Sequence, residues 1–205
     1  MRERNVNTYK KHSIIFYEGN PPMGLFGVSS GKVKIFNHGA NGRIQIARIA
    51  RPGDLLGYRA LFAEEPYSAT AEVLEEATIC FLDRPLAYSI VRRNPEVALR
   101  LMEHVCRDLR LAERHMLNLV QNPVVERTAA LLLDLERDFG EPAPRGTRLA
   151  IDLTREEMAE MIGTTAESLI RTLSEFRQKD WIELDGHRVL VKDASELAKL
   201  IPQDV

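Results

Sequence analysis

The sequence predicts an α+β fold in three parts: an antiparallel β-roll over residues 1–94, one long helix over residues 95–121, and a smaller helical domain with a hairpin over residues 122–205. Three observations support this division. Short β-rich runs separated by turn residues fill the first part. Helical periodicity replaces them after Asp83. Near the C-terminus, two short amphipathic helices flank Gly163 and precede a hairpin.

The composition is that of a globular chain with enough apolar material for its own core. Of the 205 residues, 44% are hydrophobic and 28% are charged, and the formal net charge is -2. This balance gives no bulk indication of a polyanionic partner. No apolar run reaches the ~18 residues that a membrane span requires, so we expect no membrane segment and a cytoplasmic protein.

The reactive residues exclude several classes of function. The two cysteines, Cys80 and Cys106, are too few for a four-thiolate zinc or iron–sulfur site, and we expect both to be buried thiols and no metal to be bound. No Ser-His-Asp set, phosphate loop or pair of catalytic carboxylates stands out in the sequence. We therefore expect a protein that is not an enzyme.

Seven short runs in the first part have the composition of β-strands, and their spacing is typical of an antiparallel sandwich or barrel. Turn residues such as Ser30-Gly31 and Pro52-Gly53 lie between them. The pattern therefore predicts an antiparallel β-roll. The expected strands cover residues 13–17, 25–29, 32–37, 43–49, 54–58, 68–74 and 78–82.

A helical pattern over residues 85–93 precedes the long helix, which we expect over residues 96–121. Apolar residues recur in the long helix at spacings of three, four or seven, which is typical of a coiled-coil seam. Because one side of this helix carries several arginines, we expect the seam to pair with a second copy of the chain. The alternative is a helix packed on its own β domain. The predicted dimer interface comprises Leu99, Met102, Cys106, Leu109, Met116 and Val120.

Glu113 interrupts this seam at a position that ordinarily takes an apolar residue. Two explanations remain, a partly hydrated helix contact and a feature related to an effector. If the contact is hydrated, replacing Glu113 with leucine should tighten the dimer.

The second half of the chain begins with a helix after Asn122-Pro123. Proline halts the long helix because it lacks an amide donor, and it can open a new helix in its first turn. Apolar residues at helical spacing extend the new helix to about Phe139. We expect a loop over residues 140–146 and a strand over residues 148–152.

Two short helices around Gly163 form the most informative region of the sequence. Thr154 caps the first helix, and Glu157 three residues later completes a capping box. Gly163 ends that helix, and Thr164 or Thr165 caps the second. This arrangement is a helix-turn-helix, in which the second helix enters the DNA major groove and the first helix braces it.

The exposed side of the second helix carries side chains that suit base edges. Arg171 can donate two hydrogen bonds to guanine, and Glu167 can accept one from cytosine. The two residues are four apart, so they share a face and can position one another; the alternative is a plain surface ion pair. The Asp185-Gly186 turn predicts a hairpin wing. The predicted DNA-binding residues are Thr154, Arg155, Thr164, Thr165, Glu167, Ser168, Arg171, His187 and Arg188.

The charge of this region is unfavourable for DNA binding. Residues 145–205 hold nine lysines and arginines against twelve aspartates and glutamates, whereas a basic footprint is the usual mark of a DNA-binding domain. The DNA hypothesis therefore requires the cations to gather on one face. The alternative function is a ligand-binding sensor module whose winged domain mediates protein contacts.

The order of the parts carries further information. A β-roll with Gly31-Lys32-Val33-Lys34 and Pro52-Gly53-Asp54-Leu55-Leu56-Gly57 precedes a long helix and a winged helix-turn-helix. From about Tyr9 to Ile201 the chain thereby resembles the Crp/Fnr family of bacterial transcription regulators, which includes the catabolite activator and the fumarate-nitrate regulator.

The resemblance implies a cyclic-nucleotide-binding-like jelly roll and a homodimer joined through its long helices. Such a dimer presents two recognition helices to a two-fold symmetric site on double-stranded DNA, and it activates transcription through contact with RNA polymerase. The match is strongest at Glu167 and Arg171, where the base-reading pair of the family lies. Ala166 replaces an arginine that precedes this pair in the catabolite activator.

By the same resemblance, the effector pocket departs from the cyclic AMP pattern. In that pattern a Gly-Glu pair holds the ribose and an Arg-Ser pair holds the phosphate; Gly57-Tyr58 and Tyr67-Ser68 stand at those places here. Ala112 and Glu113 replace the hydroxyls that meet the adenine. We therefore expect no cyclic AMP binding and no bound cofactor. The cysteine count excludes an iron–sulfur sensor, while four histidines leave haem binding open: His12, His38, His104 and His115.

Overall fold

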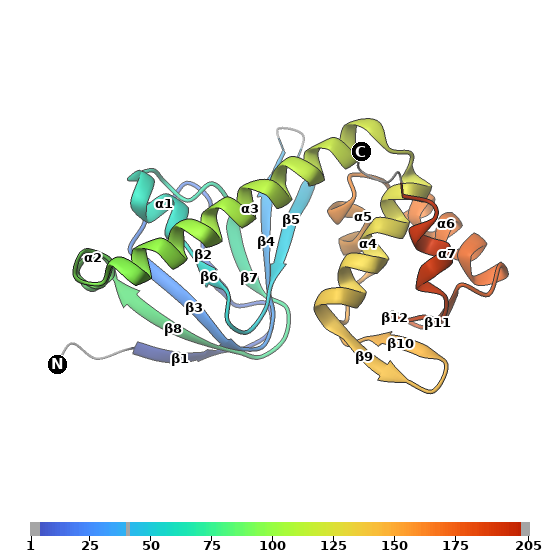
Figure 1. The fold of residues 1–205 in the computed structure, drawn as a ribbon, viewed down its shortest axis with the longest axis horizontal. Helices are drawn as coiled ribbons and strands as arrows, with labels where there is room; N and C mark the ends of the chain where they lie inside the picture. The colour runs from blue at the N-terminus through green and yellow to red at the C-terminus, as the bar shows by residue number, and fades with distance from the viewer. Residues whose placement is uncertain (1–4, 40–41, 202–205) are drawn as a thin grey trace. The chain divides into compact units, whose positions relative to one another are not determined.

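The computed structural model describes residues 5–39 and 42–201, and these form two compact units that meet within one long helix between Leu109 and Arg110 (Figure 1). The sequence-based division at residues 94 and 121 treats that helix as a separate part. The outermost residues of the predicted end domains, 1–4 and 202–205, lie outside the described residues.

The first unit consists of two four-stranded antiparallel sheets (Figure 1). One sheet has the order β1-β8-β3-β6 and the other the order β2-β7-β4-β5. Buried side chains from both sheets, including Phe26, Val33 and Ile79, form a shared core. The strands are β1 (Asn5–Tyr9), β2 (Ile14–Phe16), β3 (Gly24–Ser30), β4 (Val33–His38), β5 (Ile44–Ala50), β6 (Leu55–Leu56), β7 (Thr70–Val73) and β8 (Ala77–Asp83).

Two features of this unit differ from the sequence prediction. The strand expected over residues 54–58 is only the two residues of β6, because Gly57 adopts a left-handed conformation with φ 80° and turns the chain into the short helix α1 (Tyr58–Ala63). The strand β1 was not predicted, since its mostly exposed residues show no apolar face. It is fixed instead by antiparallel pairing with β8 along its whole length.

Helix α2 (Arg84–Arg93) and the long helix α3 (Pro95–Gln121) follow the sheets. Asp83 caps α2 by accepting a hydrogen bond from the Leu86 amide at 2.8 Å. None of the 27 residues of α3 is buried. The cysteines also differ from expectation: Cys80 is only half-buried and Cys106, on α3, is exposed.

The second unit contains a helical core and a small antiparallel sheet of order β11-β12-β10-β9. The buried leucines of α4 and the apolar stripe of α6 form most of the core. The elements after α3 are α4 (Val124–Phe139), β9 (Gly140–Ala143), β10 (Gly146–Leu149), α5 (Arg155–Met161), α6 (Ala166–Gln178), β11 (Ile182–Asp185), β12 (Arg188–Val191) and α7 (Ala194–Ala198).

The prediction of a loop over residues 140–146 is wrong in part, because this segment contains β9, which forms a hairpin with β10. This strand was not predicted because it contains Pro142, and proline cannot donate a backbone hydrogen bond to a sheet. The position is tolerated because β9 is an edge strand of its sheet. None of the helices in the described part of the chain is long and apolar enough to cross a membrane.

Candidate nucleic-acid interface

Both helices of the predicted helix-turn-helix begin at the threonines that cap them. The Thr154 hydroxyl accepts a hydrogen bond from the Glu157 amide at 3.1 Å, and the Glu157 carboxylate accepts one from the Thr154 amide at 3.0 Å. This reciprocal pair is the predicted capping box. Of the two threonines proposed for the second cap, Thr165 performs it, accepting from the Ser168 amide at 3.2 Å. The cap therefore places the first residue of α6 at Ala166.

The turn between α5 and α6 is held from outside by Arg127. Gly163 has φ 60°, a left-handed conformation that glycine adopts without strain. The Arg127 guanidinium, from α4, donates through Nη1 to the carbonyl oxygen of Ile162 and, at 3.3 Å, to that of Gly163. These carbonyls lie just past the end of α5, where backbone acceptors lack helical partners. The sequence analysis missed Arg127, because no local spacing indicates partners 35 residues away.

The helix α6 has one buried and one exposed side. Leu169, Leu173 and Phe176 are fully buried on the inner side. Glu167 and Arg171 are exposed on the outer side, and within the described residues they form no ion pair with each other. Their charged ends are therefore available to another molecule, so the predicted mutual positioning is absent from the free chain.

Two uncharged residues, Ser168 and Ile170, complete the outer side of α6. Ser168 is half-buried, and its hydroxyl accepts from that of Thr165 at 3.1 Å. Ile170 retains 47% exposure although it is large and apolar. The sequence analysis did not select Ile170, but its signal was present, because Ile170 does not fit the buried stripe of α6.

The guanidinium of Arg155, which the sequence places among the DNA-binding residues, is already bonded to the backbone of the wing. Its Nη2 atom donates to the carbonyl oxygen of Gly186 at 2.8 Å, and its Nη1 atom donates to that of His187 at 3.4 Å. Burial lowers the pKa of the Arg155 guanidinium. Arg155 thus ties the first helix of the motif to the turn of the wing.

The wing itself is the hairpin of β11 and β12, and His187 and Arg188 are exposed at its turn. Gly186 in this turn has φ 58°, as a tight hairpin turn requires. The wing therefore places one arginine and one histidine where they can contact a partner beside α6.

Some charged side chains of the second unit are paired with one another, and others are exposed without an ion pair. Asp180 and Glu196 form ion pairs with Lys192 and Lys199. Three exposed arginines form no ion pair within the described residues, namely Arg171, Arg177 and Arg188. These ion pairs leave the net charge of the region unchanged, but the three arginines are exposed and available to a partner.

The predicted effector residues do not form an open anion site. Tyr67 is a core residue with 4% exposure; its ring stacks on Phe16 at 4.1 Å, and its hydroxyl accepts from the Met23 amide at 3.2 Å. Ser68 is exposed, and its carbonyl oxygen accepts from the side chain of Asn37. Neither side chain supplies a cation, as a phosphate would require.

Gly57 and Tyr58 form the tight connection from β6 to α1. A Cβ atom on Gly57 would lie 3.0 Å from the Gly24 carbonyl oxygen, so only glycine fits there. The Tyr58 hydroxyl donates to the Asp108 carboxylate on α3. Burial first, and then this hydrogen bond, raise the pKa of the Tyr58 phenol. The remaining predicted effector residues, Ala112 and Glu113, are exposed and belong to the second unit.

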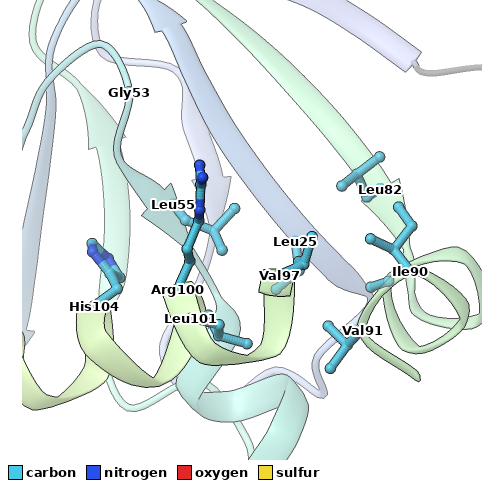
Figure 2. A pocket seen from close by; sticks show the side chains of 11 residues that line it. Leu25, Gly53, Leu55, Leu82, Ile90, Val91, Val97, Arg100, Leu101 and His104 are labelled. Carbon is cyan, nitrogen blue, oxygen red and sulfur yellow. The ribbon is translucent and has the colours of Figure 1, made fainter. Parts of the chain in front are cut away.

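The first unit also contains a cavity of about 280 Å³ between the β1-β8-β3-β6 sheet, α2 and α3 (Figure 2). Its walls are mainly apolar and include Leu25, Leu82 and Ile90, while Arg100 and His104 approach it from α3. His104 is the only one of the four predicted haem-ligand candidates that lines it. Within residues 5–39 and 42–201, no three His, Cys, Asp or Glu side chains are placed to hold a metal ion.

Comparison with known families gives two matches that together span most of the chain. Residues 6–94 match the cyclic nucleotide-binding domain, and residues 126–200 match the Crp-like helix-turn-helix domain. The second match contains α5, α6 and the wing, which are the elements described above as the candidate interface.

Individual relatives agree with these matches. The chain is 32% identical over 191 residues to the CRP-like cAMP-activated global transcriptional regulator of Mycobacterium tuberculosis, covering 93% of this chain and 85% of that protein. It is 30% identical to the nitrogen fixation regulation protein FixK of Azorhizobium caulinodans, covering 94% and 77%. Among solved structures, FixK2 from Bradyrhizobium japonicum superposes with a TM-score of 0.89 at 23% identity, covering 99% and 100%, which shows a shared fold.

Proposed function

The chain belongs to the Crp/Fnr family of DNA-binding transcription regulators, and from that premise we propose that it acts as a homodimer that places two copies of α6 in the major groove of a two-fold symmetric DNA site. The family is not enzymatic. Because the chain belongs to this family, DNA binding is favoured over protein contacts as the role of the winged unit. Activation through contact with RNA polymerase is part of the proposal and rests on the family alone.

The observation that carries the proposal is the apolar face of α3. Leu109 is 58% exposed and Val120 is 80% exposed, and Leu99, Met102 and Met116 are exposed to a similar degree. An exposed apolar stripe of this length, broken only at Glu113, is rare on a monomer and is stabilised when a second helix covers it. Because the stripe follows the heptad spacing of a two-stranded coiled coil, a second copy of α3 is the partner whose pattern matches it.

A substitution in the seam tests the dimer. Leu109→Lys places a charge at a core position of the paired helices and should dissociate the dimer in sedimentation equilibrium, because burying an unpaired charge is costly. Arg107→Lys, at an exposed position two residues earlier, is the matched control and should leave the dimer intact. A wild-type chain that sediments as a monomer at all attainable concentrations would contradict the proposal.

In the proposed complex, α6 reads the bases and other groups fix its position. Arg171, Glu167 and Ser168 face the base edges, where arginine recognises guanine and glutamate recognises cytosine. Arg188 and His187 of the wing contact phosphates, and the α6 N-terminus with Thr165 adds backbone donors. A gel shift at two salt concentrations tests the phosphate contacts, since DNA affinity must fall steeply as salt rises.

We also propose that the protein acts without cyclic AMP and without a bound cofactor. Two observations support this: the buried Tyr67 stands where the resemblance expects the phosphate-binding arginine, and Tyr58 is bonded to Asp108. Calorimetric titration of the protein with cyclic AMP should give no binding heat. An absorbance spectrum of the purified protein tests the haem alternative, which predicts a Soret band; we expect none.

A further inference from the structure

Asp108 on α3 is contacted by side chains from two other segments of the first unit. The Tyr58 hydroxyl, at the start of α1, donates to its Oδ2 atom. The Arg48 guanidinium, from β5, lies with Nη2 3.8 Å from the same oxygen. Residues far apart in the sequence therefore meet on one carboxylate, at the place where the resemblance expects an effector.

The cluster also fixes the orientation of its own members. Arg48 Nη2 donates to the Leu55 carbonyl oxygen at 3.4 Å, and Arg48 Nη1 lies 3.6 Å from Asp54 Oδ2. The His104 ring lies edge-on to the Tyr58 ring, with centroids 5.3 Å apart. Arg48 is shared between two carboxylates and a carbonyl, so its donors and its charge are met by groups of the first unit itself.

This charge balance is unfavourable for an anionic ligand. The guanidinium of Arg48 stands between the carboxylates of Asp54 and Asp108, while the exposed Arg59 directly follows Tyr58 in α1. A cyclic phosphodiester would have to compete with Asp54 and Asp108 for Arg48 and to displace a hydrogen-bonded phenol. The chain thus supplies its own occupant where the fold could hold an effector.

Asp108 also connects this cluster to the dimer seam. On α3, Val97, Leu101 and His104 line the cavity (Figure 2). Leu99, Met102 and Leu109 lie on a different side of α3 and are exposed. Contacts that hold the first side therefore determine which residues the helix presents outward.

We propose that Tyr58 and Arg48 act as a built-in substitute for an effector: by holding Asp108 they fix α3 so that its apolar seam is presented to a second copy without a ligand. This inference rests on the proposed function as a DNA-binding homodimer. It assigns a regulatory role to Tyr58, Arg48 and Asp108, and it describes a regulator whose DNA-competent state is the resting state.

The test removes one oxygen atom. Tyr58→Phe keeps the ring and its contact with His104 but deletes the donor to Asp108. Tyr88→Phe is the matched control, because the Tyr88 hydroxyl also donates within this unit, to the Leu61 carbonyl oxygen at 3.1 Å, without touching α3. Each full-length variant is compared with wild type by amide hydrogen exchange over residues 97–112, by sedimentation, and by DNA affinity without any added ligand.

We expect Tyr58→Phe to accelerate exchange in α3 and to weaken dimerisation and DNA binding by about tenfold, the effect of losing a hydrogen bond to a charged group. Tyr88→Phe should match wild type in all three measurements. Asp108→Asn keeps an acceptor but loses the charge that Arg48 contacts. Its exchange rate, dimerisation and DNA affinity should lie between those of Tyr58→Phe and Tyr88→Phe.

Two results would overturn the inference. One is Tyr58→Phe behaving as Tyr88→Phe does in exchange, dimerisation and DNA binding. The other is a wild-type protein that dimerises or binds DNA only after cyclic AMP is added. A wild-type monomer without DNA affinity would contradict the proposed function instead, and the exchange comparison would still decide whether Tyr58 holds α3.

Discussion

The Nη2 atom of Arg155 donates a hydrogen bond to the carbonyl oxygen of Gly186 at 2.8 Å. This contact joins the first turn of α5 to the turn of the wing, which lies 31 residues later in the chain. It gives Arg155 a positioning role, because a guanidinium held on the wing keeps the wing at a fixed place beside the helix-turn-helix.

Replacing Arg155 with methionine should separate this positioning role from a direct phosphate contact. Arg155→Met keeps an aliphatic stem but removes the donors, so the free energy of unfolding should fall by about 1–2 kcal/mol, and DNA affinity should fall equally for all sequences. Thermal unfolding and binding to a random DNA pool measure the two effects. Arg188→Met, at an exposed position on the wing, is the control. The free energy of unfolding of this variant should equal that of wild type. The slope of log DNA affinity against log salt concentration should fall in magnitude by about 1.

If Arg155→Met unfolds like wild type but lowers the DNA affinity for all sequences and reduces the salt slope by about 1, the tether carries no energy and Arg155 contacts a phosphate directly.

The dimer seam should become tighter when its interruption is removed. Glu113 occupies an exposed position among the apolar residues of α3, and pairing two copies would bring two carboxylates together. Glu113→Leu should therefore lower the dimer dissociation constant by at least about tenfold, since it removes charge repulsion and adds apolar contact. Sedimentation equilibrium measures this change.

Arg107→Leu adds the same side chain at an exposed position off the seam and should not change dimer affinity. An equal effect of both substitutions would show that general hydrophobicity, and not the seam, drives association.

The sequence alone predicted the elements whose signals are local. The Thr154 cap, the turn at Gly163 and the hairpin turn at Gly186 all appear in the structure. Each depends on residues within a few positions of one another, where capping and left-handed conformations leave a strong mark on residue choice.

Long-range contacts left no such mark. The bonds from Arg127 to Ile162 and from Tyr58 to Asp108 join residues more than 30 positions apart. The polar strand β1 and the proline-containing edge strand β9 are fixed by their partners and not by their own composition. The roles of the predicted DNA-binding and dimer residues remain predictions.

Acid should destabilise the second unit through His115. Burial lowers the pKa of His115, which Asp134 opposes and Arg127 reinforces, and its Nε2 atom is buried without a hydrogen-bond partner in the described residues. The unfolded chain therefore binds a proton at a higher pH than the folded chain does. The stability that the neutral imidazole contributes is fully present above about pH 6.5, the ordinary pKa of histidine. It is lost as the pH falls below that value toward the pKa of His115 in the folded chain.

Denaturant unfolding on either side of pH 6.5 measures this loss. His115→Gln should reduce the loss, and His187→Gln, which changes an exposed histidine in the same unit, should retain it. Identical pH dependence in His115→Gln and wild type would exclude His115 as the cause.

The central claim is that Arg171 on α6 reads a base in each half of a two-fold site, and selection of bound sequences from random DNA tests it most directly. Arg171→Ala should lose ~1–3 kcal/mol for the preferred site and relax the preference at one base pair per half-site. Arg177→Ala, which removes another exposed arginine of α6, should leave the preference at every position unchanged. A selected site without two-fold symmetry, or an Arg171→Ala profile identical to wild type, would contradict the claim.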